Sequence, residues 1–240
     1  MRIAIVSDIH GNRRAFEAVL RDLQEVSPDL TFHGGDLAGP GSSPAEIVDR
    51  IRDLGWKGVL GNTDEMLFKP SALDEFASHS PELTPLWNVV REMAAATRDA
   101  LGEARLAWLR NLPQSQIRNE LALVHASPAS LWRAPGPEAG DAELESVYGG
   151  LGKPMVVYGH IHRPFVRRIS QVAIANSGSA GLPYDGDRRA AYLLIDDDKV
   201  SIRRVEYDIA SEIKNLFACR LPHADWLAKI LHSASPQMPS

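Results

Sequence analysis

Cysteine is almost absent from this 240-residue chain, which contains Cys219 and no other. A single cysteine cannot form an internal disulfide and cannot supply the thiolate cluster of a Cys-based zinc site. The sequence therefore excludes a disulfide-stapled scaffold and predicts a protein of the reducing cytoplasm.

Long apolar runs are missing as well. No stretch approaches the ~20 apolar residues that span a bilayer, and the apolar run at residues 3–6 is too short for a secretory signal. We therefore expect neither a membrane span nor a membrane partner.

Positive charge is not in excess, because 26 Lys and Arg stand against 31 Asp and Glu, a formal net charge of −5. A protein that coats nucleic acid normally carries a basic stripe, so no stable nucleic-acid complex is expected. The length and the 44% hydrophobic content fit a single domain over residues 1–240. The oligomeric state stays unknown.

The first quarter of the chain alternates short β-rich runs with amphipathic helices. Strands are predicted at 3–6, 30–32 and 58–60, and helices at 15–26 and 44–54. Strands that alternate with helices become parallel neighbours through right-handed crossovers, which predicts an α/β sheet.

The rest of the chain departs from this rhythm. Residues 64–112 hold no β-rich run and are predicted to form a helical excursion, and the tail at 222–240 is predicted to hold a short helix and then to fray. Between them lie short strands typical of a mixed sheet, so two packed sheets flanked by helices would accommodate the chain. These strands are predicted around Ile117 and at 121–125, 155–158, 165–169, 172–175, 191–195 and 200–205, with a hairpin turn at 196–199.

Side chains with ligating atoms follow several of the predicted strands. The first three sets are separated by 28 and 26 residues, and each interval matches one strand–helix–strand crossover. Successive strand ends then lie side by side at the carboxyl edge of the sheet, where ligands collect in α/β proteins. The candidates are Asp8, His10, Asp36, Asn62, His125, His160 and His162.

These residue types agree with one another as a metal-binding set. Any one motif alone is explained as well by a turn, but two carboxylates, one amide and four imidazoles in this order predict a metal site. Such oxygen and nitrogen ligands suit manganese, iron, zinc or nickel better than magnesium or calcium. Seven ligands are more than one tetrahedral ion can bind, and their number matches two divalent ions that share a carboxylate. Manganese is the preferred metal.

Six motifs carry a resemblance to a known family. They are SDIHGN (7–12), GDLAGPG (35–41), GNTD (61–64), VHASP (124–128), GHIH (159–162) and NSGS (176–179). Together they resemble the calcineurin-like metallophosphoesterases, specifically the small bacterial and archaeal phosphodiesterase branch. The resemblance covers most of the chain and implies a four-layer αββα sandwich with a dinuclear metal centre.

The resemblance also implies a role for each candidate. A hydroxide bridging the two ions would attack phosphorus, with Asp36, Asn62 and His125 closest to catalysis. One ion would be held by Asp8, His10 and His162, the other by Asn62, His125 and His160, and Asp36 would bridge them.

The chain departs from the family pattern at Thr63, where many members carry a histidine that protonates the leaving oxygen. The missing histidine favours hydrolysis of phosphodiesters over hydrolysis of monoesters. The next residue, Asp64, is expected to hold the turn. The excursion at 64–112 directly follows the Asn62 turn and is expected to form one wall of the substrate cleft.

We therefore predict a metal-dependent phosphodiesterase acting on a small-molecule or nucleotide phosphoester. The alternatives are a DNA nuclease or phosphomonoesterase with the same centre, and a catalytically silent interaction module of the same fold. DNA nucleases with this centre are longer and carry a capping domain. Proteins of the catalytically silent branch lack some of the metal ligands, whereas all seven are present here.

Overall fold

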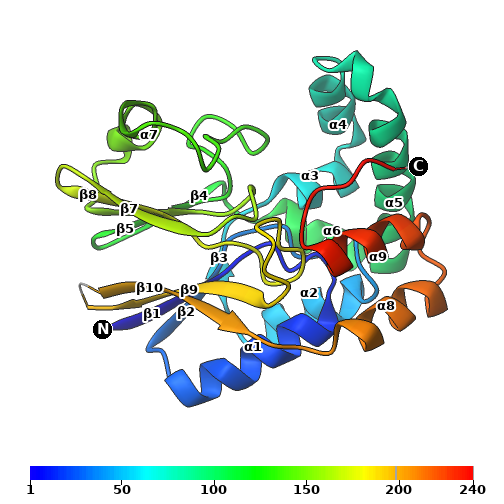
Figure 1. Ribbon diagram of the computed structural model, residues 1–240, viewed down its shortest axis with the longest axis horizontal. Helices are drawn as coiled ribbons and strands as arrows, with labels where there is room; N and C mark the ends of the chain where they lie inside the picture. The colour runs from blue at the N-terminus through cyan, green and yellow to red at the C-terminus, as the bar shows by residue number, and fades with distance from the viewer. Residues whose placement is uncertain (198, 240) are drawn as a thin grey trace.

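The computed structural model describes residues 1–197 and 199–239 (Figure 1). Asp198, in the predicted hairpin turn, and Ser240, at the end of the predicted tail, lie outside the described residues. Two five-stranded sheets lie one above the other, with helices around them (Figure 1).

The first sheet has the strand order β10-β9-β1-β2-β3. Its three N-terminal strands are parallel, as the crossover spacing predicts, and β9 and β10 extend it as antiparallel strands. The bounds are β1 (Arg2–Val6), β2 (Leu30–His33), β3 (Lys57–Gly58), β9 (Ala190–Asp196) and β10 (Lys199–Val205).

The second sheet has the order β4-β5-β6-β8-β7. Its central strands β5, β6 and β8 are parallel, while β4 and β7 pair antiparallel at the two edges. The bounds are β4 (Ser115–Arg118), β5 (Leu121–Val124), β6 (Met155–Tyr158), β7 (Phe165–Ile169) and β8 (Val172–Asn176).

The core lies in three apolar layers. Between the sheets, Ile5 and Phe32 of the first sheet belong to one buried cluster with Leu123 and Val157 of the second. Strand side chains alternate between two faces, so the outer face of each sheet must be covered by helices. Helices α1 (Arg13–Val26) and α2 (Pro44–Asp53) cover the first sheet, and α7 (Asp141–Tyr148) covers the second. This arrangement confirms the predicted αββα architecture.

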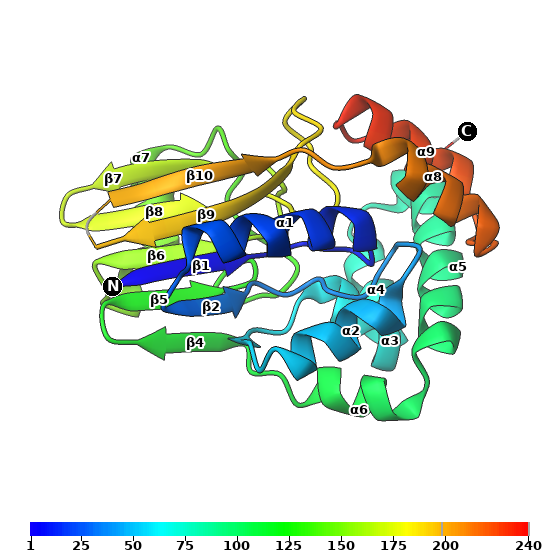
Figure 2. The ribbon, with the colours of Figure 1, turned by 90° about the horizontal axis from the view of Figure 1, so that it is seen from below.

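The remaining helices gather at the carboxyl end of the parallel strands, as Figure 2 shows. They are α3 (Asn62–Phe68), α4 (Pro70–Ala77), α5 (Thr84–Leu101), α6 (Glu103–Arg110), α8 (Ile209–Ala218) and α9 (Ala224–Ser233), with short 3-10 turns η1 (Pro81–Leu83) and, elsewhere, η2 (Gly149–Leu151). In the described part of the chain, no helix is long and apolar enough to cross a membrane.

The tail contains the predicted short helix, and residues 236–239 after it have no regular secondary structure. Residues 224–233 form helix α9, and its apolar face, with Leu227 and Ile230, packs against Val89 and Met93 of α5. The helix is ordered because that stripe is buried, which a tail read in isolation does not reveal. Helices α7 and α8 were not predicted at all.

Candidate metal centre

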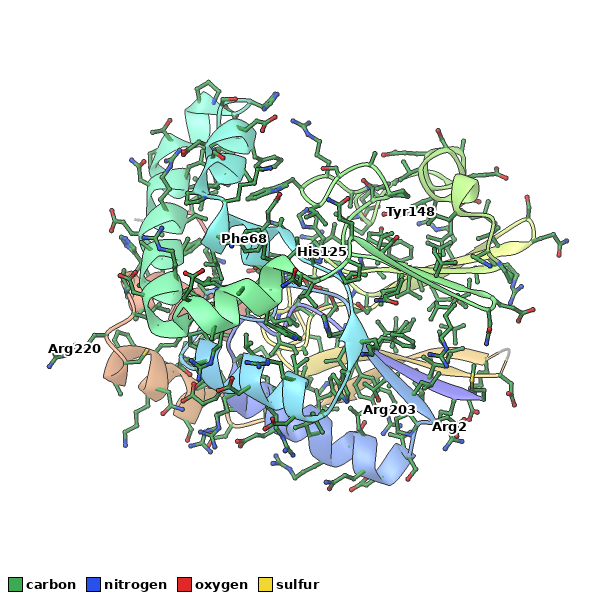
Figure 3. The ribbon with its side chains drawn as sticks, turned by 180° about the vertical axis from the view of Figure 1, so that it is seen from behind. Arg2, Phe68, His125, Tyr148, Arg203 and Arg220 are labelled. Atoms are coloured by element: carbon green, nitrogen blue, oxygen red, sulfur yellow. The ribbon has the colours of Figure 1, made fainter. Side chains whose placement is uncertain are left out.

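The seven predicted ligands come from the ends of strands in both sheets. Asp8 and Asp36 follow β1 and β2, and Asn62 begins α3 after β3. His125 directly follows β5 and lies near the middle of the molecule, where the sheets meet the helices (Figure 3). The pair His160 and His162 follows β6.

The backbone at these strand ends is unusual. Five of the seven ligands adopt positive φ angles between 50° and 65°, namely Asp8, His10, Asp36, His160 and His162. Such left-handed residues are uncommon outside glycine and cluster at functional sites, where the surrounding structure holds them. Here hydrogen bonds from the His10 N–H to the Asp36 carbonyl and from the Asp8 N–H to the Gly35 carbonyl, both 3.0 Å, join the two loops.

Glycine is required where these loops approach one another. A Cβ on Gly61 would lie 2.0 Å from Asp36 Oδ1, and one on Gly159 would lie 2.4 Å from Asp8 Oδ2. The glycines before Asn62 and His160 therefore allow the ligand loops to pack in contact.

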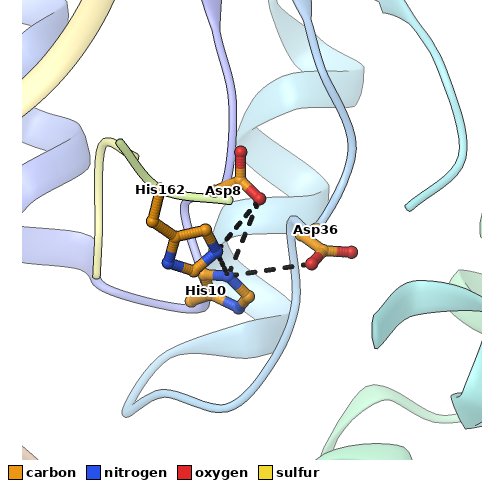
Figure 4. A group of neighbouring side chains, drawn as sticks. All are labelled: Asp8, His10, Asp36 and His162. Carbon is orange, nitrogen blue, oxygen red and sulfur yellow. Dashed lines mark hydrogen bonds and ion pairs between the residues drawn. The ribbon is translucent and has the colours of Figure 1, made fainter. Parts of the chain in front are cut away.

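One group of ligands is shown in Figure 4. Its ligating atoms, from Asp8, His10, Asp36 and His162, all lie within 4.8 Å of one another, and all four residues are buried. His162 Nε2 lies 3.2 Å from Asp8 Oδ1, and His10 Nε2 lies 3.8 Å from Asp36 Oδ2.

The other three ligands form a second group around the amide of Asn62. Its Oδ1 lies 2.9 Å from His125 Nε2 and 2.9 Å from His160 Nδ1. His125 Nε2 also lies 3.4 Å from Asp36 Oδ1. Asp36 thus presents one oxygen to each group, and the structure brings all seven predicted residues together.

The hydrogen-bond pattern leaves lone pairs directed inward. The Nδ1 atoms of His10, His162 and His125 lie 2.5, 2.6 and 2.8 Å from the backbone carbonyls of Gly39, Leu182 and Gly34. A carbonyl can only accept, so each Nδ1 carries a proton, and the neutral form of each ring has its lone pair on Nε2.

These lone pairs face other acceptors. His10 Nε2 and His162 Nε2 are 3.0 Å apart, and His125 Nε2 faces carboxylate and amide oxygens. Acceptors that converge without a proton between them fit a cation, and imidazoles oriented by backbone carbonyls are typical of metal ligands.

Burial sets the charge state of the cluster. It lowers the pKa of His10 to about 3, with a further contribution from neighbouring His162, so this ring is neutral at pH 7 and able to ligate. Burial also raises the pKa of Asp36, reinforced by the charge of Asp8. A bound cation would favour the ionised carboxylate, which is the state that ligates.

Asp64 holds the turn, as predicted. Its buried carboxylate accepts hydrogen bonds from the backbone N–H groups of Leu37 and Ala38, each 3.1 Å long. It thereby fixes the loop that carries Asp36. Thr63 donates its backbone N–H to Asp36 Oδ1 at 2.9 Å.

A cavity of about 190 Å³ lies beside the metal-binding side chains. Its wall includes residues of α3 and α5, so the excursion lines the cleft as expected, but it also includes α9 and Tyr184, which were not predicted as site residues. The Tyr184 ring stacks on His162 with centroids 4.4 Å apart. The lining residues of α9 follow no motif, and their helical spacing indicates burial alone, whereas Tyr184 lies in a loop.

The fold and the cluster together define an α/β protein with a site for divalent metal ions. Comparison with known proteins identifies the family: a model of the calcineurin-like phosphoesterase superfamily domain matches residues 1–199. The chain belongs to this superfamily, which confirms the resemblance carried by the six motifs.

Individual relatives agree with this assignment. An uncharacterized protein of Methanocaldococcus jannaschii is 31% identical over 95% of this chain and 96% of its own length. The phosphodiesterase YfcE of Escherichia coli is 24% identical over 84% of this chain and 91% of its own. The crystal structure of a metallophosphoesterase from Sphaerobacter thermophilus superposes with a TM-score of 0.79 at 29% identity, covering 98% of this chain and 100% of that chain.

Proposed function

We propose that this hydrolase of phosphoric esters acts on phosphodiesters, and that the seven clustered residues hold two divalent ions, preferably manganese. The observation that carries the proposal is the position of Asp36, whose two oxygens face His10 on one side and His125 on the other. One carboxylate between two groups of inward-facing ligands fits a bridging role.

Each group has a complete ligand set of its own. Asp8, His10 and His162 would hold one ion, and Asn62, His125 and His160 the other. When bound, the ions supply Lewis acidity that activates water and offsets charge on the phosphoryl oxygens. The amide and imidazole groups suit manganese better than magnesium.

The chain's own groups orient these ligands. The carbonyls of Gly39, Leu182 and Gly34 fix which imidazole nitrogen faces inward, and the Thr63 N–H holds the carboxylate of Asp36. Substrate entering the cavity would meet Asp36, Asn62 and His160 at its inner end. Its phosphoryl group would lie against the ligands while its ester groups point outward.

The first test is reconstitution. Chelator-stripped protein should be inactive toward bis(p-nitrophenyl) phosphate, and manganese should restore hydrolysis better than magnesium at equal concentration. Elemental analysis should find two manganese ions per chain. Clearly less than one ion per chain after reconstitution would overturn the proposed site.

Ligand variants separate the bridge from the other ligands. Asp36→Asn should lower kcat by roughly 10³-fold or more, and His162→Ala should lose mainly one ion, because the bridge serves both sites. His79→Ala is the matched control, since this exposed histidine lies in no ligand group. Equal metal content in Asp36→Asn and His79→Ala would contradict a bridging role.

A further inference from the structure

The cavity beside the metal centre has two chemically different sides. Its inner end is formed by the metal-binding side chains, and its outer wall by apolar residues of α3, α5 and α9. Val90 and Ala94 of α5 and Trp226 of α9 line this wall, and Leu227 and Ile230 pack behind it against Met93. Figure 2 shows α9 lying against α5 at this end of the molecule.

The volume of the cavity limits the size of a bound group. Its volume of about 190 Å³ includes the space against the metal-binding side chains, where the phosphoryl group would lie. The space along the apolar wall is therefore suited to a compact ester group, such as a single ring or a short alkyl chain.

The lining also restricts what can bind. Within residues 1–197 and 199–239, no lysine or arginine lines the cavity. A second phosphate or an anionic headgroup placed there would be desolvated without a charge partner, which is costly. This disfavours a polyphosphate chain in the cavity.

Polar groups outside the metal site are few. The lining adds the hydroxyls of Thr63, Thr97 and Tyr184, and Thr97 is 2% exposed with no hydrogen-bond partner among the described residues. The hydroxyl oxygens of Thr63 and Thr97 are themselves buried. The set is too small to pair the polar edge atoms of a nucleobase, which would be left unsatisfied.

We propose that this cavity binds a compact apolar ester group, a single aryl ring or short alkyl chain, of the phosphodiester substrate. The inference rests on the proposed function, because the phosphoryl group is taken to lie at the metal centre. Val90, Ala94 and Trp226 then determine which ester group is accepted. The preferred substrate is an aryl or alkyl phosphodiester and not a dinucleoside polyphosphate.

Phosphonates test this without a leaving group. Phenylphosphonate and methylphosphonate share one phosphoryl head and differ in the apolar group, so their dissociation constants from the manganese-loaded protein can be compared by calorimetry. We expect phenylphosphonate to bind about tenfold tighter or more, because its ring is removed from water in the cavity.

Filling the cavity should remove that difference. Ala94→Leu places a larger side chain in the wall and should weaken phenylphosphonate binding about tenfold, with methylphosphonate binding and manganese content unchanged. Ala100→Leu is the matched control, because Ala100 lies on the same helix but is exposed. Leu227→Ala, which enlarges the cavity from α9, should instead improve binding of the larger naphthylphosphonate.

The outcomes separate the two proposals. If both phosphonates bind the wild-type protein equally, the cavity inference is overturned while the phosphoesterase function stands. If the manganese-loaded protein binds neither phosphonate but hydrolyses bis(p-nitrophenyl) phosphate, the cavity inference alone is overturned. If it also fails to hydrolyse that diester, the proposed function fails and the inference fails with it. Loss of the phenyl preference in Ala94→Leu and not in Ala100→Leu supports the inference.

Discussion

At the scale of single residues, backbone groups orient the candidate metal-binding side chains of this protein. Three imidazoles take their orientation from main-chain carbonyls, and Asp36 takes its own from the Thr63 N–H. The residue that follows Asn62 therefore has two effects. Its backbone orients the carboxylate of Asp36, and its side chain stands where the family resemblance places an acid for the leaving oxygen.

Thr63 sets the expected dependence on leaving group. A threonine hydroxyl is far too weak an acid to protonate a leaving oxygen near pH 7, and a positioned general acid typically contributes ~10²–10⁴-fold. Without one, the rate should fall steeply as leaving-group pKa rises. The measurement is kcat/KM for aryl phosphodiesters of graded phenol pKa.

The matching variant is Thr63→His. An imidazole there titrates near neutral pH, so the series should become flatter and turnover of monoesters should improve. A nearly flat series for the wild-type protein would show that another group already acts as the acid.

Asp64 offers a second prediction at this scale. Asp64→Ala would leave the buried N–H groups of Leu37 and Ala38 without an acceptor, at a cost of roughly 1–3 kcal/mol for each unsatisfied group. Asp64→Asn keeps an oxygen that can accept both bonds and should be far milder. Thermal unfolding in chelator separates this effect from metal binding, and equal melting temperatures for the two variants would contradict it.

Residues with a motif could be predicted from the sequence, and residues without one could not. Asp8, Asp36 and Asn62 each follow a buried strand at crossover spacing, so their convergence follows from parallel pairing. Trp226 and Leu227 line the same cavity. They reach it from a helix far along the chain, and nothing in their local pattern indicates which core they join.

The same distinction holds for whole elements. Strand β6, a continuous apolar run, and strand β7 both have the bounds that were predicted. Helix α8 was missed because its apolar stripe is short and only three residues separate it from strand β10. It is held by a buried glutamate, Glu212, whose carboxylate accepts hydrogen bonds from the Ser42 hydroxyl at 2.7 Å and the Arg14 N–H at 3.4 Å.

Glu212 makes the stability of this element depend on pH. Burial raises its pKa in the folded protein, against smaller opposing contributions from Ser42 and Arg14. A raised folded-state pKa means that the favourable contribution is complete below the unfolded pKa and is lost as pH rises through the folded value. As pH rises from the unfolded-state pKa of Glu212 to its folded-state pKa, the wild-type protein should therefore lose stability relative to Glu212→Gln.

The test is a comparison of melting temperatures between pH 4 and pH 8. Glu212→Gln should melt close to the wild-type protein at the acid end and above it at the neutral end. Glu206→Gln, at an exposed position, should show no such divergence. A constant difference across the range would mean that Glu212 does not titrate in the folded protein.

At the scale of the whole molecule, the metal centre connects the two sheets. Asp8, Asp36 and Asn62 belong to the first sheet and its crossovers, whereas His125, His160 and His162 follow strands of the second. Direct bonds already cross this junction, since the His160 N–H donates to Asp8 Oδ1 at 3.1 Å and the Ala180 N–H to the Ser7 carbonyl at 2.9 Å. Ions shared by ligands from both sheets would add to these links.

Metal binding should therefore stabilise the whole fold. An ion that binds the folded chain and not the unfolded chain adds about 2.7 kcal/mol per site when its concentration is 100 times Kd. At roughly 2–4 °C per kcal/mol for a chain of this size, each bound manganese ion should raise the melting temperature by about 5–11 °C over chelator-treated protein. His79→Ala should show the full shift and Asp36→Asn much less of it. A melting temperature that does not respond to manganese, in protein shown by elemental analysis to bind it, would mean that the ions do not hold the two sheets together.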